Sequence, residues 1–139
     1  MKIKANRVFS FAIIIAVYAM ATAVGIICFN AFNDMKNLFF QILVADVIAT
    51  AVVFFFSLIL KNASVYDPYW SVQPIVICCA LAIGKPLNFF QIFILVVICL
   101  WGVRLTLNWA YTFKNLNHQD WRYTMLKEKT GIFYPLVNF

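Results

Sequence analysis

The sequence predicts an all-α membrane protein, a bundle of about four transmembrane helices with an interfacial segment on the cytoplasmic side. Hydrophobic residues make up 65% of the chain and charged residues 12%, whereas soluble domains have about 45–50% and about 25%. Such a chain lacks the polar side chains needed to cover a surface in water. Its apolar runs are separated by short polar patches, and residues 1–139 are long enough for one transmembrane helical domain.

The first predicted span, residues 8–29, is an uncharged run that follows Lys2, Lys4 and Arg7. A cleaved signal peptide is the alternative, because residues 19–21 (Ala-Met-Ala) have the small-x-small pattern of a cleavage site. However, the apolar region of a signal peptide has only about 7–15 residues, and this run is longer. The sequence therefore favours an uncleaved first helix.

Three further spans are expected at residues 38–60, 69–83 and 87–109. The second carries one acid near its middle, and the fourth carries Arg104 in its last third. The third is short for a membrane span unless the aromatic residues at its start are included, since a crossing takes about 20 residues. Residues 111–139 form a polar and aromatic interfacial segment.

Basic residues flank the predicted spans instead of forming a stripe on a polar element. This is the positive-inside pattern, and it predicts a multi-pass protein whose amino terminus and carboxyl-terminal segment are cytoplasmic. The net charge of +6 therefore does not indicate a nucleic-acid partner, for which a basic patch on one face would be expected. The expected surroundings are a lipid bilayer.

Asp46 is the clearest candidate for a functional residue, because an ionisable group inside a membrane helix is costly. At about 100° per residue, Asp46, Thr50 and Ser57 lie within about 40° of one another, so this polar stripe should face the interior of the bundle. It could line a substrate or proton path. It could equally join helices through hydrogen bonds.

The fourth predicted span offers a second cluster, because Arg104, Asn108 and Tyr111 share one helix face. The arginine either extends to the headgroup level or forms an anion-binding corner. Asp67 should lie at the same depth and is the expected partner of Arg104.

A third cluster, residues 118–123, places His, Asp, Arg and two aromatic rings beside the membrane. It fits an amphipathic interfacial segment, but Arg also binds phosphate bidentately, so a nucleotide cofactor is the alternative. No metal site is predicted, because the four cysteines lie in apolar runs without C-x-x-C spacing. The residues indicate no particular catalytic group.

Three short motifs follow one another in the order that one known family shows. They are Asp67-Pro68-Tyr69-Trp70-Ser71-x-x-Pro74, Trp101-Gly102-x-Arg104-Leu105-x-x-Asn108 and Gln119-Asp120-Trp121-Arg122-Tyr123. Together they resemble the uncharacterised branch, a domain of unknown function, of the steroid 5-alpha-reductase-like membrane family. The resemblance covers roughly residues 38–139.

The resemblance implies a helical membrane reductase that uses NADPH to reduce a carbon–carbon double bond of a lipid-like substrate of steroid or isoprenoid type. It assigns cofactor binding to Arg104, Asn108, Asp120 and Arg122. The substrate cavity would be bordered by Asp46 and by the loop from Tyr66 to Ser71, with Asp67, Tyr69, Trp70 and Ser71 as binding residues.

The family's carboxyl-terminal Arg-x-Pro-Asn-Tyr-type cofactor motif does not occur in the sequence, and residues 131–139 begin another apolar run. We therefore expect the chain to be the amino-terminal part of a reductase, completed by helices from a longer product or from another chain. Two other functions are open: a catalytically silent membrane protein, and a small four-helix transporter that uses Asp46.

Overall fold

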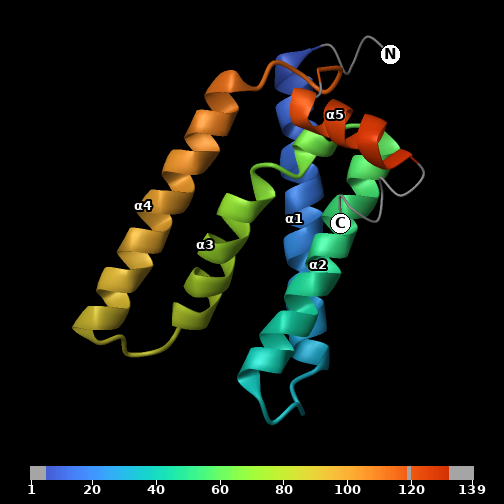
Figure 1. Cartoon of the computed structure of the whole chain (residues 1–139). Helices are drawn as coiled ribbons and strands as arrows, with labels where there is room; N and C mark the ends of the chain where they lie inside the picture. Colours follow the sequence, from blue (N-terminus) through green and yellow to red (C-terminus); the bar gives the residue numbers. More distant parts are fainter. Residues whose placement is uncertain (1–5, 119, 132–139) are drawn as a thin grey trace. The chain divides into compact units, whose positions relative to one another are not determined.

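The computed structural model describes residues 6–118 and 120–131. In this part of the chain the regular structure is entirely helical (Figure 1), which confirms the predicted fold class. The elements are α1 (Arg7–Ala31), α2 (Leu38–Leu60), the short 3-10 helix η2 (Ala63–Val65), α3 (Tyr69–Ala82), α4 (Phe89–Thr112) and α5 (Trp121–Thr130).

Among the described residues, three helices are long and apolar enough to cross a membrane: α1, α2 and α4. Their bounds agree with the first, second and fourth predicted spans to within a few residues. The third predicted span also forms a helix, α3, but its 14 residues rise only about 21 Å, less than the roughly 30 Å of a hydrocarbon core. The chain is thus an integral membrane protein with three candidate spans, and the crossing by α3 stays a prediction.

Asparagine and aspartate side chains set most of the helix starts. The carboxamides of Asn6, Asn37 and Asn88 accept hydrogen bonds from the first backbone N–H groups of α1, α2 and α4. The carboxylate of Asp120 does the same for α5. These caps satisfy donors that have no partner within their own helix. α3 has no side-chain cap and follows Pro68.

The chain divides into two compact units. The first comprises residues 1–66 and 114–139 and contains α1, α2, η2 and α5; the second comprises residues 67–113 and contains α3 and α4.

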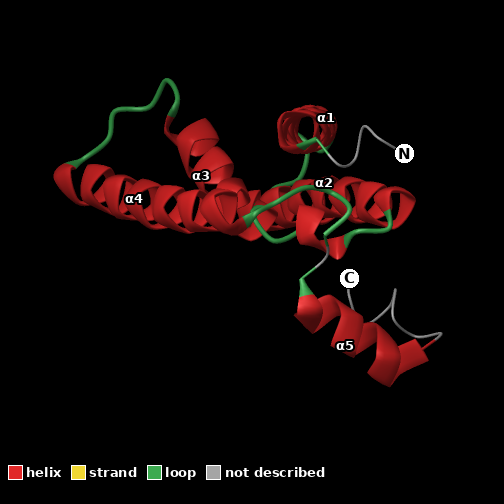
Figure 2. Ribbon diagram, turned by 90° about the horizontal axis from the view of Figure 1, so that it is seen from above, coloured by secondary structure: helices red, strands yellow, loops and turns green. Residues whose placement is uncertain are grey.

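In the first unit, α1 and α2 form an antiparallel pair (Figure 1). Gly25 allows a close approach, because a Cβ atom there would lie 3.3 Å from the Cβ atom of Ala49. One turn further along α1, the carbonyl of Phe29 accepts a side-chain hydrogen bond of 2.7 Å from Gln41. Helix α5 lies outside this pair and buries none of its residues (Figure 2).

In the second unit, α3 packs on α4 at Gly102, where a Cβ atom would lie only 2.5 Å from the carbonyl oxygen of Ser71. One turn further along α4, the hydroxyl of Thr106 is hydrogen-bonded to that of Ser71 at 2.8 Å. Small residues and hydroxyl pairs are typical of helix contacts in membranes.

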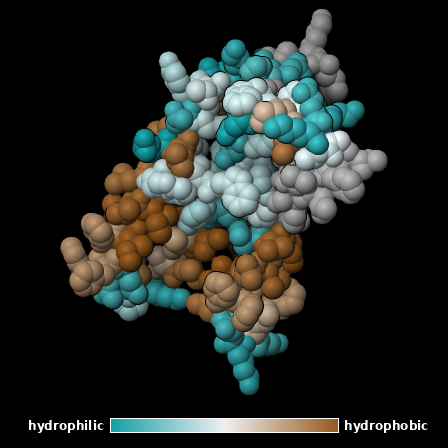
Figure 3. Space-filling view, in the orientation of Figure 1, coloured by the Kyte–Doolittle hydropathy of each residue, from teal (hydrophilic) through white to brown (hydrophobic). Residues whose placement is uncertain are grey.

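Hydrophobic side chains gather along the long helices, whereas hydrophilic side chains gather at the helix ends and at the loops that join them (Figure 3). The exposed side chains of α4 include Phe93, Leu100 and Leu107. A surface of this polarity is suited to lipid rather than water.

Candidate functional site

The segment of residues 114–118 is fastened to the start of α1 in the first unit. The hydroxyl oxygen of Ser10 accepts a hydrogen bond of 3.1 Å from the backbone N–H of Leu116. The same hydroxyl donates to the carbonyl of Asn6 at 2.9 Å. Ser10 and Leu116 are both buried, so the loop that follows α4 returns to the amino-terminal end of α1.

Asn62 fastens the same loop to the end of α2. Its amide nitrogen donates to the carbonyls of Leu116 and His118, at 2.7 and 3.3 Å. Its amide oxygen accepts from the backbone N–H of Ser64 at 2.9 Å and so caps η2. Only 2% of Asn62 is exposed. A buried amide is costly unless it is hydrogen-bonded, and here both of its ends are.

Ser64 continues the connection to α5. Its hydroxyl oxygen accepts a hydrogen bond of 3.0 Å from the backbone N–H of Asp120, the residue that caps α5. The Asp120 carboxylate in turn binds the Arg122 guanidinium through two hydrogen bonds, of 3.0 Å from Nε and 2.9 Å from Nη2. Two predicted cofactor residues are thus paired with each other.

The pairing with Arg122 lowers the pKa of the Asp120 carboxyl group. Hydrogen bonds from Arg122 hold the pKa of Asp120 below its ordinary value of 3.8, because they stabilise the carboxylate, and they outweigh partial burial, which acts in the opposite direction. The guanidinium is outside the protein interior, with 61% of the Arg122 side chain exposed. An anionic ligand could therefore reach it from solvent.

The segment after Asn62 also contacts α1. The phenol of Tyr18 donates a hydrogen bond of 2.6 Å to the carbonyl of Val65. The next residue, Tyr66, is 2% exposed and lies within electrostatic range of Asp46. Burial and, to a smaller extent, the Asp46 carboxylate raise the pKa of the Tyr66 phenol above 10.0. The phenol therefore stays protonated at neutral pH.

The predicted polar stripe of α2 faces the interior only in part. Ser57 is buried and donates to the carbonyl of Phe54 in its own helix at 2.7 Å. Asp46 and Thr50 are half-buried and lie beside the buried face. The buried residues of α2 are spaced four positions apart and are Gln41, Ala45, Ala49, Val53 and Ser57.

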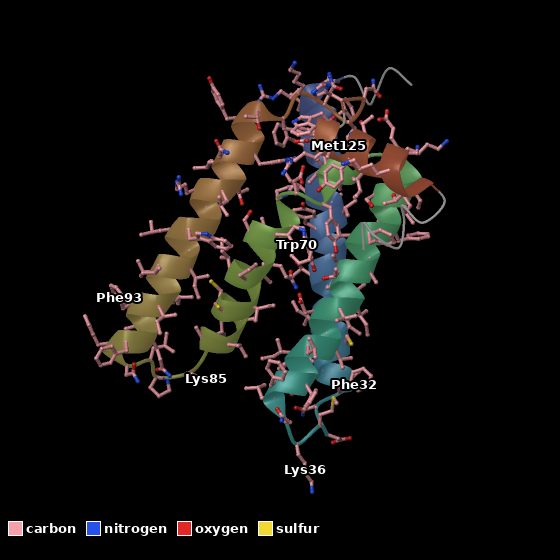
Figure 4. All side chains as sticks on the ribbon, in the orientation of Figure 1. Phe32, Lys36, Trp70, Lys85, Phe93 and Met125 are labelled. Carbon is pink, nitrogen blue, oxygen red and sulfur yellow. The ribbon has the colours of Figure 1, made fainter. Side chains whose placement is uncertain are left out.

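The second unit contains the remaining predicted site residues. Tyr69 and Ser71 are buried, Asp67 is half-buried, and Trp70, labelled on α3 in Figure 4, is 57% exposed. Ser71 joins α3 to α4 through its hydrogen bond to Thr106, so its side chain serves the helix contact.

Arg104 and Asn108 share an exposed face of α4, as predicted. We expected an ion pair between Arg104 and Asp67, and this expectation was wrong, since no such pair forms among the described residues. The reason is geometric. Gly102 faces α3, and a residue two positions further along a helix points about 200° away, to the opposite side.

Four residues of the first unit were not predicted as site residues: Ser10, Tyr18, Asn62 and Ser64. Their role depends on segments about 50 or more positions away in sequence, so no local pattern reveals it. The one signal in the sequence was a turn-forming Asn and Ser directly after an apolar span that ends at Lys61.

Within residues 6–118 and 120–131, no group of three or more His, Cys, Asp or Glu residues could hold a metal ion. The geometry instead defines a helical membrane protein with a hydrogen-bonded polar cluster at one end of α1 and α2.

Comparison with known proteins then gives the family. The family model described as "Protein of unknown function (DUF1295)" matches residues 53–138, more than half of the chain, and the chain belongs to this family. No curated protein and no solved structure matches the chain.

Proposed function

We propose that the chain is part of a membrane reductase that uses NADPH to reduce a carbon–carbon double bond of a lipid-like substrate, of steroid or isoprenoid type. One observation carries the proposal. A single short segment, residues 62–66, carries the buried Tyr66 phenol within electrostatic range of Asp46 and also holds the backbone of Asp120, which is paired with Arg122. The three sequence motifs between Asp67 and Tyr123 support the same class of reaction.

Tyr66 and Asp46 suit the proton-transfer part of such a reaction. The Tyr66 phenol is protonated and buried, so it can donate a hydrogen bond or a proton to a substrate that enters from the apolar side. Asp46 lies within electrostatic range of that phenol. The apolar faces of the helices match a substrate that reaches the site through lipid.

The polar end suits the phosphates of a dinucleotide. Arg122 is exposed, and arginine binds phosphate as well as carboxylate through paired N–H groups. Asp120 uses its Nε and Nη2 donors, so a phosphate would share the guanidinium with that carboxylate or displace it. Arg104 and Asn108 of the second unit are exposed as well and are further candidates. When bound, the cofactor would supply the hydride. Arg122 would hold an anionic group, and Tyr66 would supply the proton.

The experiment that tests the proposal follows deuterium from the nicotinamide of labelled NADPH into a lipid that carries a conjugated double bond. We expect transfer in native-type membranes by the chain together with the carboxyl-terminal helices that the family resemblance implies. Tyr66→Phe should lower kcat at least about 100-fold, the usual scale of a lost general acid, without changing the KM for NADPH. Arg122→Ala should raise that KM with kcat little changed.

Tyr111→Phe is the matched control, because it removes a phenol from a residue that is 86% exposed, and it should leave both constants unchanged. Absence of deuterium transfer by the wild-type protein would overturn the proposal. Proton-coupled solute uptake that is abolished in Asp46→Asn but retained in Arg122→Ala would favour a transporter instead.

A further inference from the structure

We infer that Asn62 and Ser64 are positioning residues, which fix Asp120 and Arg122 at the end of the α1–α2 pair so that Arg122 can bind an anionic ligand. The anionic ligand is the NADPH of the proposed function, so this inference rests on that proposal. Asn62 and Ser64 are close in sequence, but their side chains bind a loop that arrives from the far end of the chain.

Residues 114–118 and Asp120 depend on a few buried hydrogen bonds for their position. Helix α5 buries no residue fully, and Tyr123, Leu126 and Thr130 are half-buried, so packing fixes it less firmly than the fully buried contacts of the loop before it. The loop is held by the Leu116 backbone, bonded to Ser10 and Asn62, and by the backbone N–H of Asp120, bonded to Ser64. Together these contacts set where α5 begins.

Burial strengthens the attachment at Asn62 and Ser64. The two residues are 2% and 4% exposed, so their hydrogen bonds are shielded from water. Losing one partner leaves a buried polar group unsatisfied, which is costlier than losing a bond at the surface. The loop should therefore stay attached through these bonds while the Asp120–Arg122 pair beyond them remains open to solvent.

Asp120 connects this attachment to Arg122. Its carboxylate caps α5 and binds the guanidinium of Arg122 at the same time, and its backbone is what Ser64 holds. The arginine is thus placed through consecutive contacts that start at the buried η2 segment. A ligand that binds this guanidinium avoids the cost of ordering a loose loop.

Two variants separate the contacts. Asn62→Asp keeps the oxygen that caps η2 and removes both N–H donors to Leu116 and His118. Ser64→Ala removes only the acceptor for Asp120. The matched control is Ser57→Ala, because Ser57 is equally buried but its hydroxyl donates within its own helix. Ser64→Thr retains a hydroxyl and is the rescue variant.

Two measurements are made on the whole protein in lipid nanodiscs. Hydrogen exchange, resolved by peptide, should accelerate at least about tenfold over residues 114–125 in both test variants and stay unchanged in α1 and α2, which shows that the fold is intact. The NADPH dissociation constant should rise at least about tenfold in both, with kcat within about twofold of wild type. Ser57→Ala and Ser64→Thr should match wild type in both measurements.

Unchanged exchange over residues 114–125 in Asn62→Asp and Ser64→Ala would overturn the inference. So would accelerated exchange with an unchanged NADPH dissociation constant, because the loop would then be attached without positioning the arginine. A wild-type protein that binds no NADPH overturns the proposed function. The exchange data alone then decide whether Asn62 and Ser64 position Asp120.

Discussion

The Asp120 carboxylate makes two contacts, and its pKa depends on both. It caps α5 and binds Arg122, and the arginine lowers its pKa. We expect Arg122→Ala to raise the pKa of Asp120 toward the ordinary value of 3.8, because the main stabilising donor of the carboxylate is lost. Titration of a ¹³C-labelled aspartate carboxyl by NMR measures this shift.

The sign of the pH effect follows from the lowered pKa. The ionised carboxylate stabilises the start of α5 above the ordinary pKa, and this contribution is lost as the pH falls through the lowered one. The start of α5 should therefore fray at a higher pH in Arg122→Ala than in the wild-type protein. Lys127→Ala, in the last turn of the same helix, should leave the titration unchanged. Equal pKa values in all three proteins would contradict the assignment.

Single residues also mark the limit of what the sequence predicts. Asp46, Asp120 and Arg122 could be selected because charge beside or inside an apolar run is conspicuous. The direction in which Arg104 points could not be predicted, since it depends on Gly102 facing α3. Asn62 could not be found either, because its partners are brought to it only by the fold.

At the scale of helices, Gly102 allows α4 to approach α3 more closely than Gly25 allows α1 to approach α2. A Cβ atom at Gly102 would lie 2.5 Å from a backbone oxygen of α3 and 2.6 Å from Ile75, whereas one at Gly25 would lie 3.3 Å from a side-chain Cβ atom of α2. A backbone oxygen cannot move without displacing its helix. Gly102→Ala should therefore destabilise the α3–α4 pair by about 1–3 kcal/mol, the usual range for overpacking.

Gly25→Ala serves as the matched variant, with the same added methyl group and a smaller expected loss, under about 1 kcal/mol, because a few tenths of an ångström of movement relieve it. Unfolding in mixed micelles with increasing SDS, followed by circular dichroism, measures both. A Gly25→Ala protein less stable than Gly102→Ala would reverse the assignment of the tight contact.

The helices themselves were largely predictable, whereas the loops between them were not. Long apolar runs and their polar ends located α1, α2 and α4, because membrane helices must be apolar along their whole length. No local pattern indicated that Ala63–Val65 would form a 3-10 helix, with the carbonyl of Val65 bonded to Tyr18. That contact joins two segments 47 positions apart, so it belongs to tertiary structure.

For the molecule as a whole, contacts within the first unit bear on how often the chain crosses the membrane. Leu116 binds Ser10 and Asn62, so the chain re-enters this unit at the end where α1 begins and α2 finishes. Residues 67–113 must then leave and return on one side. Because α4 is long enough to cross, the segment containing α3 should cross as well, which gives four crossings.

The short length of α3 does not conflict with four crossings. A crossing takes about 20 residues. The 14 residues of α3 and residues 83–88, which join α3 to α4, together reach that length.

Cysteine labelling in intact cells or sealed vesicles tests this topology. We expect Lys36→Cys and Lys85→Cys to react with an impermeant maleimide from the same side, and Lys114→Cys only from the other side, because an odd number of crossings separates it from each of them. The unsubstituted chain, whose four cysteines lie in helices, gives the background. If the cysteines introduced at positions 85 and 114 reacted from one face, either α3 would not cross or the hydrogen bonds of Leu116 to Ser10 and Asn62 would not exist in the membrane.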